Sequence, residues 1–224
     1  MENIVISIGG SVLLSKDLDV QYYKKFAKLI EKFSKDYKIY IIVGGGKPAR
    51  KYIQLGRKLG LNEKTLDDFG IIITRINAKL LTNIINTSNT KIPTTTNKAI
   101  KMRNKIIIMG GTTPGHSTDY VGSELASKTK SEKFIIATNV DGVYDKDPNK
   151  NNDAKQIKEI TPEKLIKKYG ISWKSAGSNV VIDGPALKEI QNNEILTYVL
   201  NGKKLAELEK VLQDKKFNGT VIKK

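Results

Sequence analysis

Short apolar runs and longer amphipathic segments alternate along the whole chain. Runs rich in isoleucine and valine are typical of strands buried on both faces, and apolar residues at spacings of three and four are typical of helices. The runs predict strands over residues 4–8, 39–43, 105–109, 134–137, 195–200 and 218–222. The periodic segments predict helices over residues 19–35, 47–60, 70–88, 120–130 and 203–212, and two more that start near residues 161 and 184. This alternation indicates a mainly parallel sheet with helices on both faces.

Three further segments carry local signals. Residues 91–97 include Pro93 and predict a short edge strand, because proline cannot donate to a sheet ladder. Residues 153–160 are expected to return as the second arm of a hairpin that follows the 134–137 strand. Asp67 and Asp68 stand just before the predicted helix at 70–88, where an acidic side chain ordinarily caps the first turn.

Glycines follow three of the predicted strands directly, at residues 9–10, 44–46 and 110–111. A glycine has no Cβ, so its backbone can approach a ligand closely and its amide can bind an anion. The 44–46 turn leads into a helix that carries Lys47 and Arg50 in its first turn. The helix dipole disfavours cations there, so a bound phosphate would explain their placement. The turn does not match the Walker pattern of nucleotide-binding loops.

Two polar loops complete this edge of the sheet. The segment Thr138–Pro148 offers carboxylates, an aromatic ring and free amides that suit a nucleotide with its metal ion. The alternative is a plain hairpin around Asp141–Gly142 with its carboxylates in water. The loop at 112–119 supplies hydroxyls and amides for a phosphate or a sugar. Its His116 is the chain's single histidine and has no ligand companions, which indicates pocket lining and no metal site.

Ligands of open α/β sheets collect at the carboxyl ends of the strands, where all of these loops are expected to meet. Three glycine turns with basic residues and a late acidic pair predict two phosphorylated ligands held end to end. That arrangement is what phosphoryl transfer requires, because its catalysis consists mostly of positioning and charge stabilisation.

Composition narrows the class of protein. The 224 residues carry a formal net charge of +16, which indicates either a polyanionic partner or a general lysine bias. The lysines are dispersed and no known nucleic-acid-binding motif occurs, so the bias is favoured and no specific nucleic acid is expected. The absence of cysteine excludes disulfides and fits a reducing compartment. No apolar run approaches the roughly 20 residues that span a bilayer, so a cytoplasmic protein without membrane contact is predicted.

Several segments together resemble the amino acid kinase family, and within it the archaeal-type uridylate (UMP) kinases. They are IVISIGGSVL, IIVGGGKPARKY, GIIITRINA, IIIMGGTTPGHSTD, TNVDGVYDKDP and NGTVI, which run nearly from end to end. GGGKPARKY differs from the acetylglutamate kinases, isopentenyl phosphate kinases and aspartokinases. The isopentenyl phosphate kinases place a histidine in the following helix, and here there is none.

The resemblance implies a three-layer αβα sandwich formed by one domain over 1–224, with an acceptor half at about 1–130 and an ATP half at about 131–224. It implies transfer of the γ-phosphoryl of ATP, with Mg²⁺, to UMP in pyrimidine nucleotide biosynthesis, by a homohexamer built as a trimer of dimers. The implied ATP-binding residues are Gly9, Gly10, Gly45, Arg50, Thr138, Asn139, Tyr144 and Asp147. The implied UMP-binding residues are Gly44, Asp67, Pro114, Gly115, His116, Ser117, Thr118, Asp119 and Tyr120. Asp67 would bind the ribose hydroxyls, which replaces its interpretation as a cap, and Asp119 would orient the catalytic groups.

One position departs from the family. Many members have a lysine two residues before the first paired glycine, and this chain has Ser7. A neutral hydroxyl cannot replace an ammonium group, so Lys47 is the candidate catalytic cation, together with Mg²⁺ on the phosphates. Two alternatives stay open: another small-acid or phosphate kinase of the same fold, such as an isopentenyl phosphate or carbamate kinase, and a basic nucleic-acid-binding regulator.

Overall fold

The computed structural model describes residues 1–14, 19–172 and 181–224. Their main sheet has the strand order β3-β2-β1-β4-β8-β9-β7 and is parallel at every pairing except β8 with β9. Its strands are β1 (Glu2–Ile8), β2 (Tyr37–Val43), β3 (Ile106–Met109), β4 (Lys133–Thr138), β7 (Glu159–Ile160), β8 (Thr197–Asn201) and β9 (Gly219–Ile222). The predicted mainly parallel sheet is confirmed.

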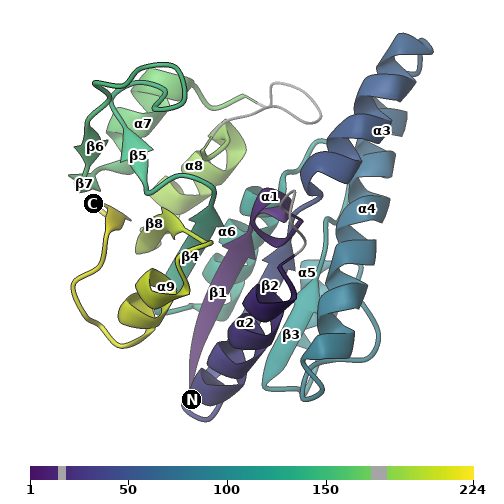
Figure 1. Cartoon of the computed structure of the whole chain (residues 1–224), viewed down its shortest axis with the longest axis vertical. Coiled ribbons are helices and arrows are strands. Elements are labelled where there is room, and N and C mark those ends of the chain that lie inside the picture. The colour runs from purple at the N-terminus through teal and green to yellow at the C-terminus, as the bar shows by residue number, and fades with distance from the viewer. Residues whose placement is uncertain (15–18, 173–180) are drawn as a thin grey trace.

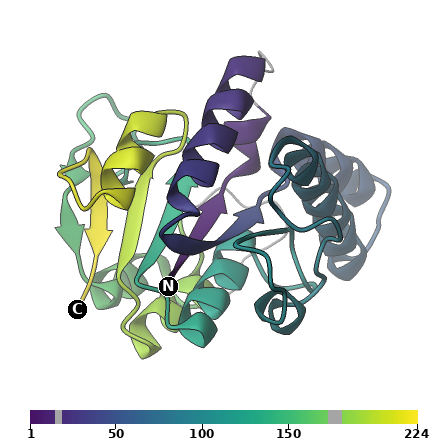
Figure 2. The same cartoon turned by 90° about the horizontal axis from the view of Figure 1, so that it is seen from below.

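Helices cover both faces of this sheet. They are α1 (Gly10–Leu13), α2 (Val20–Phe33), α3 (Gly46–Lys58), α4 (Glu63–Ile84), α5 (Thr96–Ile100), α6 (Thr118–Thr129), α7 (Pro162–Tyr169), α8 (Gly184–Asn192) and α9 (Leu205–Leu212). Figure 2 shows α2 and α9 on one face and α6 and α8 on the other, which gives the expected αβα sandwich. None of the described helices has the length and apolar character needed to cross a bilayer.

Alternation along β1 builds the two main cores. Ile4, Ile6 and Ile8 belong to the core that packs against α2 and α9. Val5 belongs to the core on the opposite face, with side chains of α6 and α8. Successive residues of a strand point to opposite faces, so one apolar run serves both cores. α3 and α4 form an antiparallel pair beside the sheet (Figure 1), closed by a small core that includes Ile53 and Leu66.

Strand register brings the candidate loops together. Ile8 lies beside both Val43 of β2 and Ala137 of β4, so the three central strands end at the same level. The turns that follow these strands therefore meet at one edge of the sheet. This edge is where the sequence places the glycine turns and the Thr138–Pro148 segment.

Two helix predictions are corrected by the structure. α4 begins at Glu63, seven residues before the predicted start, and Asn62 caps it by accepting a hydrogen bond from the amide of Thr65 at 2.9 Å. Asp67 and Asp68 thus lie inside α4 and do not cap it. The short helix α1 directly after β1 was not predicted.

The edge strand predicted over 91–97 is wrong. The side chain of Asn89 donates to the carbonyl of Ile108 at 2.9 Å and accepts from its amide at 2.6 Å. A side-chain amide thereby satisfies the backbone at the outer edge of β3, and a short helix, α5, begins at Thr96 instead. Ser88, which precedes the predicted segment, forms an isolated parallel bridge to Ile106 of β3.

The hairpin prediction is confirmed, but its turn lies elsewhere. β5 (Val143–Tyr144) pairs antiparallel with β6 (Gln156–Ile157), so the connection is the long segment between them. Asp141 precedes β5 and accepts hydrogen bonds from Asn201 at 2.9 Å and Lys204 at 2.8 Å. The alternative of a plain turn at Asp141–Gly142 is therefore wrong, although the carboxylates of Asp145 and Asp147 are exposed. Residues 174–184 are expected to form a loop before the helix predicted near residue 184, and of these residues 174–180 lie outside the described residues.

Candidate active site

A cavity of about 440 Å³ lies at the carboxyl ends of β1, β2 and β4. It reaches from α3 and α4 on one side to the β4–β5 segment and α7 on the other. Most of the predicted site residues line it: Gly9, Gly10, Gly44, Gly45, Arg50, Asp67, His116, Ser117, Thr118, Asp119, Thr138, Asn139, Tyr144 and Asp147. Four predicted residues do not line it: Lys47, Pro114, Gly115 and Tyr120. One elongated cavity thus joins the two halves of the chain.

The first two glycine turns touch backbone to backbone. A Cβ on Gly10 would lie 2.2 Å from the amide nitrogen of Gly46 and 2.5 Å from the carbonyl oxygen of Gly44. Gly46 has a φ of +66°, a conformation that side chains rarely adopt. Asn77 of α4 donates from its side chain to the carbonyl of Gly44 at 2.8 Å. The glycines are therefore required by the close approach of the two turns.

The amino end of α3 is left open for an anion. Its N-cap, Gly45, makes no side-chain capping bond, and its first turn holds no acidic residue. α6 and α8, in contrast, are capped by Ser117 and Asp183. The uncapped amides and the helix dipole of α3 both favour a phosphate at this end of the cavity.

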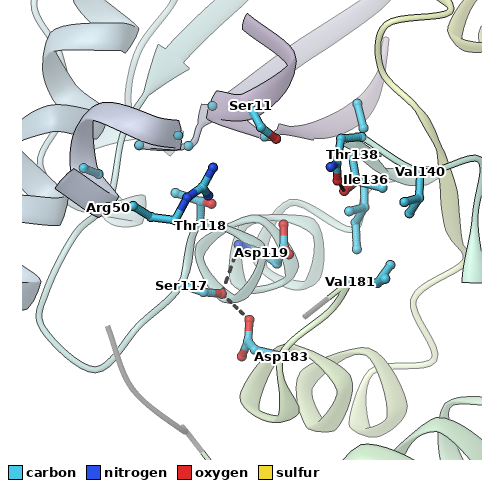
Figure 3. Close-up of a pocket in the computed structure, with 18 of the residues that line it drawn as sticks. Ser11, Arg50, Ser117, Thr118, Asp119, Ile136, Thr138, Val140, Val181 and Asp183 are labelled. Atoms are coloured by element: carbon cyan, nitrogen blue, oxygen red, sulfur yellow. Dashed lines mark hydrogen bonds between the residues drawn. The ribbon is translucent and has the colours of Figure 1, made fainter. Parts of the chain in front are cut away.

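Arg50 and Lys47 diverge although both lie early in α3. Arg50 lines the cavity, and Figure 3 shows it reaching in beside Thr118. Lys47 is exposed and outside the lining. The structure therefore places Arg50, and not Lys47, where it can contact a phosphate.

A polar network surrounds Asp119 at the floor of the cavity. The buried Ser7, which stands where a lysine was expected, donates to Oδ1 of Asp119 at 2.6 Å. Ser117 accepts from the amides of Asp119 and Tyr120 and donates to the carboxylate of Asp183 (Figure 3). Two carboxylates and two hydroxyls thus form one network below the glycine turns.

The electrostatics of this network are unusual. Enclosure by protein raises the pKa of Asp119 to about 7, repulsion from Asp183 adds to this, and the hydrogen bond from Ser7 opposes it. Burial likewise raises the pKa of Asp183, against the hydrogen bonds from Ser117 and the amide of Ala186. Buried carboxylates that repel each other favour the protonated form, and such perturbed groups in a cleft mark functional sites. Asp183 was not predicted as a site residue.

One side of the cavity is formed by α4 and the loop before α6. Asp67 accepts a hydrogen bond from the amide of Gly115 at 2.7 Å, and its pKa is raised, mainly by desolvation, which this hydrogen bond opposes. His116 stacks on Tyr120 with ring centroids 4.2 Å apart, and its Nδ1 lies 3.0 Å from the hydroxyl of Thr113. Gly115 and Tyr120 thus support lining residues without lining the cavity themselves.

The opposite side is formed by the segment between β4 and β6. Asp147 organises its own turn by accepting from the amide of Asn149 at 2.9 Å. Lys168 of α7, which was not predicted, lines the cavity and donates to the carbonyls of Tyr144 at 3.0 Å and Asp145 at 2.5 Å. These bonds hold the segment that carries Tyr144 and Asp147, and they bring the positive charge of Lys168, which also attracts the carboxylate of Asp145, to the cavity. This side can accommodate a second anionic ligand.

The described residues contain no group of three or more His, Cys, Asp or Glu side chains that could hold a metal ion. Mg²⁺ usually binds through one or two carboxylates together with substrate phosphates and waters.

Comparison with known proteins identifies the family of this chain. Residues 2–201 match the amino acid kinase family. The uridylate kinase of Methanobrevibacter smithii is 40% identical over 224 residues, which cover 99% of both chains. That of Thermococcus kodakarensis is 41% identical over 225 residues, covering 98% of both. The crystal structure of uridylate kinase from Archaeoglobus fulgidus superimposes with a TM-score of 0.86 at 38% identity, covering 99% of this chain and 100% of that one. The chain belongs to the amino acid kinase family.

Proposed function

We propose that this protein is a uridylate kinase, which transfers the γ-phosphoryl of ATP to UMP and yields UDP and ADP for pyrimidine nucleotide biosynthesis. The observation that carries the proposal is the single cavity, in which the acceptor side and the nucleotide side meet at Asp119 between the glycine turns. Identity of about 40% along nearly the whole chain with archaeal uridylate kinases supports this choice of acceptor. In this proposal residues 1–130 bind UMP and residues 131–224 bind ATP.

The chemistry follows from this placement. An oxygen of the UMP phosphate attacks the γ-phosphorus in line, and the bond to the β–γ bridging oxygen breaks with its electron pair leaving on ADP. The amides of Gly10 and Gly45 and the guanidinium of Arg50 stabilise charge on the transferred group. Asp119 and Asp183 fix Ser117 at the start of α6 and so orient the loop that faces the acceptor phosphate. No covalent intermediate on the protein is required.

Magnesium fits this site as a companion of ATP. The phosphates would supply most of its ligands, since the described side chains contain no complete metal-binding group. The ion would neutralise charge between the phosphates, and Asp119 and Asp183 at the same end of the cavity would balance its charge. This assignment is part of the proposal.

We expect the unmodified protein to turn over UMP in preference to dUMP, carbamate and isopentenyl phosphate in an ADP-release assay. Asp67→Asn should raise the KM for UMP about tenfold or more and leave the KM for ATP unchanged, because a neutral amide binds ribose hydroxyls less strongly than a carboxylate. The preference for UMP over dUMP should shrink at the same time.

The neighbouring Asp68 provides the matched control, because it lies on the same helix but is exposed and outside the cavity. Asp68→Asn should leave both KM values unchanged. Faster turnover of carbamate or isopentenyl phosphate than of UMP would overturn the uridylate kinase assignment. Tight binding of one RNA sequence without any turnover would favour the regulator instead.

Which cationic side chain compensates for the missing lysine at position 7 can also be tested. We assign this role to Arg50 ahead of Lys47, because only Arg50 lines the cavity. Arg50→Ala should lower kcat/KM about 100-fold, and Lys47→Ala should lower it less than about threefold. A loss of more than about tenfold in kcat for Lys47→Ala alone would return the catalytic role to Lys47.

Assembly into a trimer of dimers is also part of the proposal. Large apolar side chains follow the exposed sides of α3 and α4 at helical spacing and are 46% to 70% exposed. They are Tyr52, Leu55, Leu59, Ile72, Ile76 and Leu80. Stripes of this kind on adjacent helices are typical of a surface covered by another protein chain, here a second copy. Light scattering tests this, and a monomer at working concentration would contradict it.

A further inference from the structure

The GIIITRINA segment, residues 70–78, lies in the middle of α4 and packs against the start of the loop between β3 and α6. Thr74 of this segment accepts a hydrogen bond from the amide of Gly111 at 2.7 Å. The next residue, Arg75, donates from Nε to the carbonyl of Gly111 at 3.1 Å and from Nη2 to the carbonyl of Thr112 at 3.0 Å. α4 therefore holds the start of the loop between β3 and α6 through two consecutive side chains.

The loop after β3 and α4 are in close backbone contact as well as joined by hydrogen bonds. A Cβ on Gly110 would lie 2.6 Å from Oγ1 of Thr74 and 2.8 Å from the amide nitrogen of Arg75. The loop therefore leaves β3 directly against the backbone of α4. A planar guanidinium that donates to two successive carbonyls fixes direction as well as distance, which a single flexible ammonium does not.

The far end of the same loop carries acceptor-side residues. The amide of Gly115 donates to Asp67 on α4, and His116, Ser117 and Thr118 line the cavity. Gly115 has a φ of +82°, and no atom lies within 4 Å of a Cβ built there, so packing around Gly115 does not hold this end. This end is held by the Asp67 bond, by the ring contact between His116 and Tyr120 and by Ser117 at the start of α6, and the other end is anchored at Gly111–Thr112.

We infer that Arg75 is a positioning residue for the acceptor: it fixes the start of the 110–116 loop, so that Asp67 and Thr118 face the same ligand. Arg75 does not line the cavity, so it acts through the loop. The inference rests on the proposed kinase function for the identity of the acceptor, and on hydrogen bonds of the structure for the loop.

The test compares Arg75→Met and Arg75→Lys with Lys79→Met. Lys79 lies one turn further along α4 and also donates to a backbone carbonyl, that of Thr90 at 3.0 Å, outside the acceptor loop. The acceptor used is the compound that the unmodified protein turns over fastest among UMP, dUMP, carbamate and isopentenyl phosphate. If the compound turned over fastest is not UMP, the proposed function is overturned. The effect of the Arg75 variants on the KM for that compound can still be measured, so the inference on Arg75 is tested separately.

Arg75→Met should raise the KM for the acceptor about tenfold and leave the KM for ATP within about twofold, because Arg75 donates to the carbonyls of Gly111 and Thr112 in the acceptor loop. Arg75→Lys should recover part of the loss, and Lys79→Met should change neither constant. Hydrogen exchange of the peptide over 110–117 provides a readout that needs no turnover, and it should accelerate in Arg75→Met alone. Equal changes in both KM values, or unchanged exchange in Arg75→Met, would overturn the inference.

Discussion

Gly10→Ala is expected to abolish measurable turnover and to lower the melting temperature by about 6–12 °C. The new methyl group would overlap the backbone of the neighbouring glycine turn, at 2.2 Å from the amide nitrogen of Gly46 and 2.5 Å from the carbonyl oxygen of Gly44. Backbone atoms cannot rotate away as a side chain can, so the cost should reach the upper end of overpacking, about 3 kcal/mol. For a chain of this size, each kcal/mol lowers the melting temperature by roughly 2–4 °C.

The loss of activity has a separate cause. Separating the two turns would move the amides of Gly10 and Gly45 away from each other, and the phosphate end of the cavity depends on both. Binding of a nonhydrolysable ATP analogue, measured by calorimetry below the melting temperature, should therefore be lost while the protein is still folded.

Gly9→Ala is the matched stability control. A Cβ on Gly9 would lie 3.4 Å from the carbonyl of Ala137 and 3.7 Å from Oγ of Ser11, which are ordinary contacts. Its melting temperature should stay within about 2 °C of the unmodified protein, as for substitutions that create no overlap. Equal melting temperatures for the Gly9 and Gly10 variants would mean that the two turns are not rigidly packed.

The fold could be predicted wherever the signal is local. The apolar runs in β1 and β2 identify strands buried on both faces, and the register of those strands then aligns their glycine turns. The start of α4 could not be placed, because its first turns bury Leu66 against α3, and the sequence gives no such periodic stripe before residue 70. The wrong strand prediction at 91–97 has a similar cause. The side chain of Asn89, 19 residues from Ile108 in the sequence, satisfies the backbone at the outer edge of β3.

The site residues also divide into those that could be predicted from the sequence and those that could not. Asp67, Asp119 and Tyr144 were predicted from the family resemblance, and the structure gathers them around one cavity. Asp183 was missed because it lies 66 residues from Ser117, its hydrogen-bonding partner, and in the sequence it has only the features of an ordinary helix start. Lys47 and Arg50 are separated by one turn of α3, and only the packing of that helix decides which of them faces the cavity.

Asp119→Asn is expected to make the unliganded protein more stable at pH 8 and at the same time to lower kcat about 100-fold. The pKa of Asp119 is raised to about 7 by its enclosure and by Asp183, partly opposed by Ser7, whereas an aspartate in an unfolded chain titrates near 3.9. A raised pKa means that folding favours the neutral carboxyl. The associated stability is complete below about pH 4 and is lost as the pH rises through 7.

Asparagine mimics that neutral carboxyl at every pH and keeps an oxygen to accept from Ser7. The stability gained over the unmodified protein should therefore be small at pH 5 and grow to a few kcal/mol at pH 8, an upper limit because the cavity retains some solvent. In the proposed mechanism, the charged form of Asp119 holds the network when ATP and its metal are bound. The variant should therefore lower kcat roughly 100-fold, the factor typical of losing a charged positioning group. A group that destabilises the empty protein yet is required for turnover is the expected mark of a functional site.

Chemical denaturation of the unliganded protein from pH 5 to pH 9 measures the effect on stability. Asp141→Asn is the control, because the pKa of Asp141 is shifted in the opposite direction. Burial raises the pKa of Asp141, but the hydrogen bonds from Lys204 and Asn201 outweigh this and lower it overall. The stability due to Asp141 is present above the unfolded pKa and is lost only as the medium becomes strongly acidic, so this variant should keep the slope of the unmodified protein between pH 6 and pH 8. Parallel curves for the unmodified protein and Asp119→Asn would show that Asp119 is already charged in the empty cavity and would contradict the prediction.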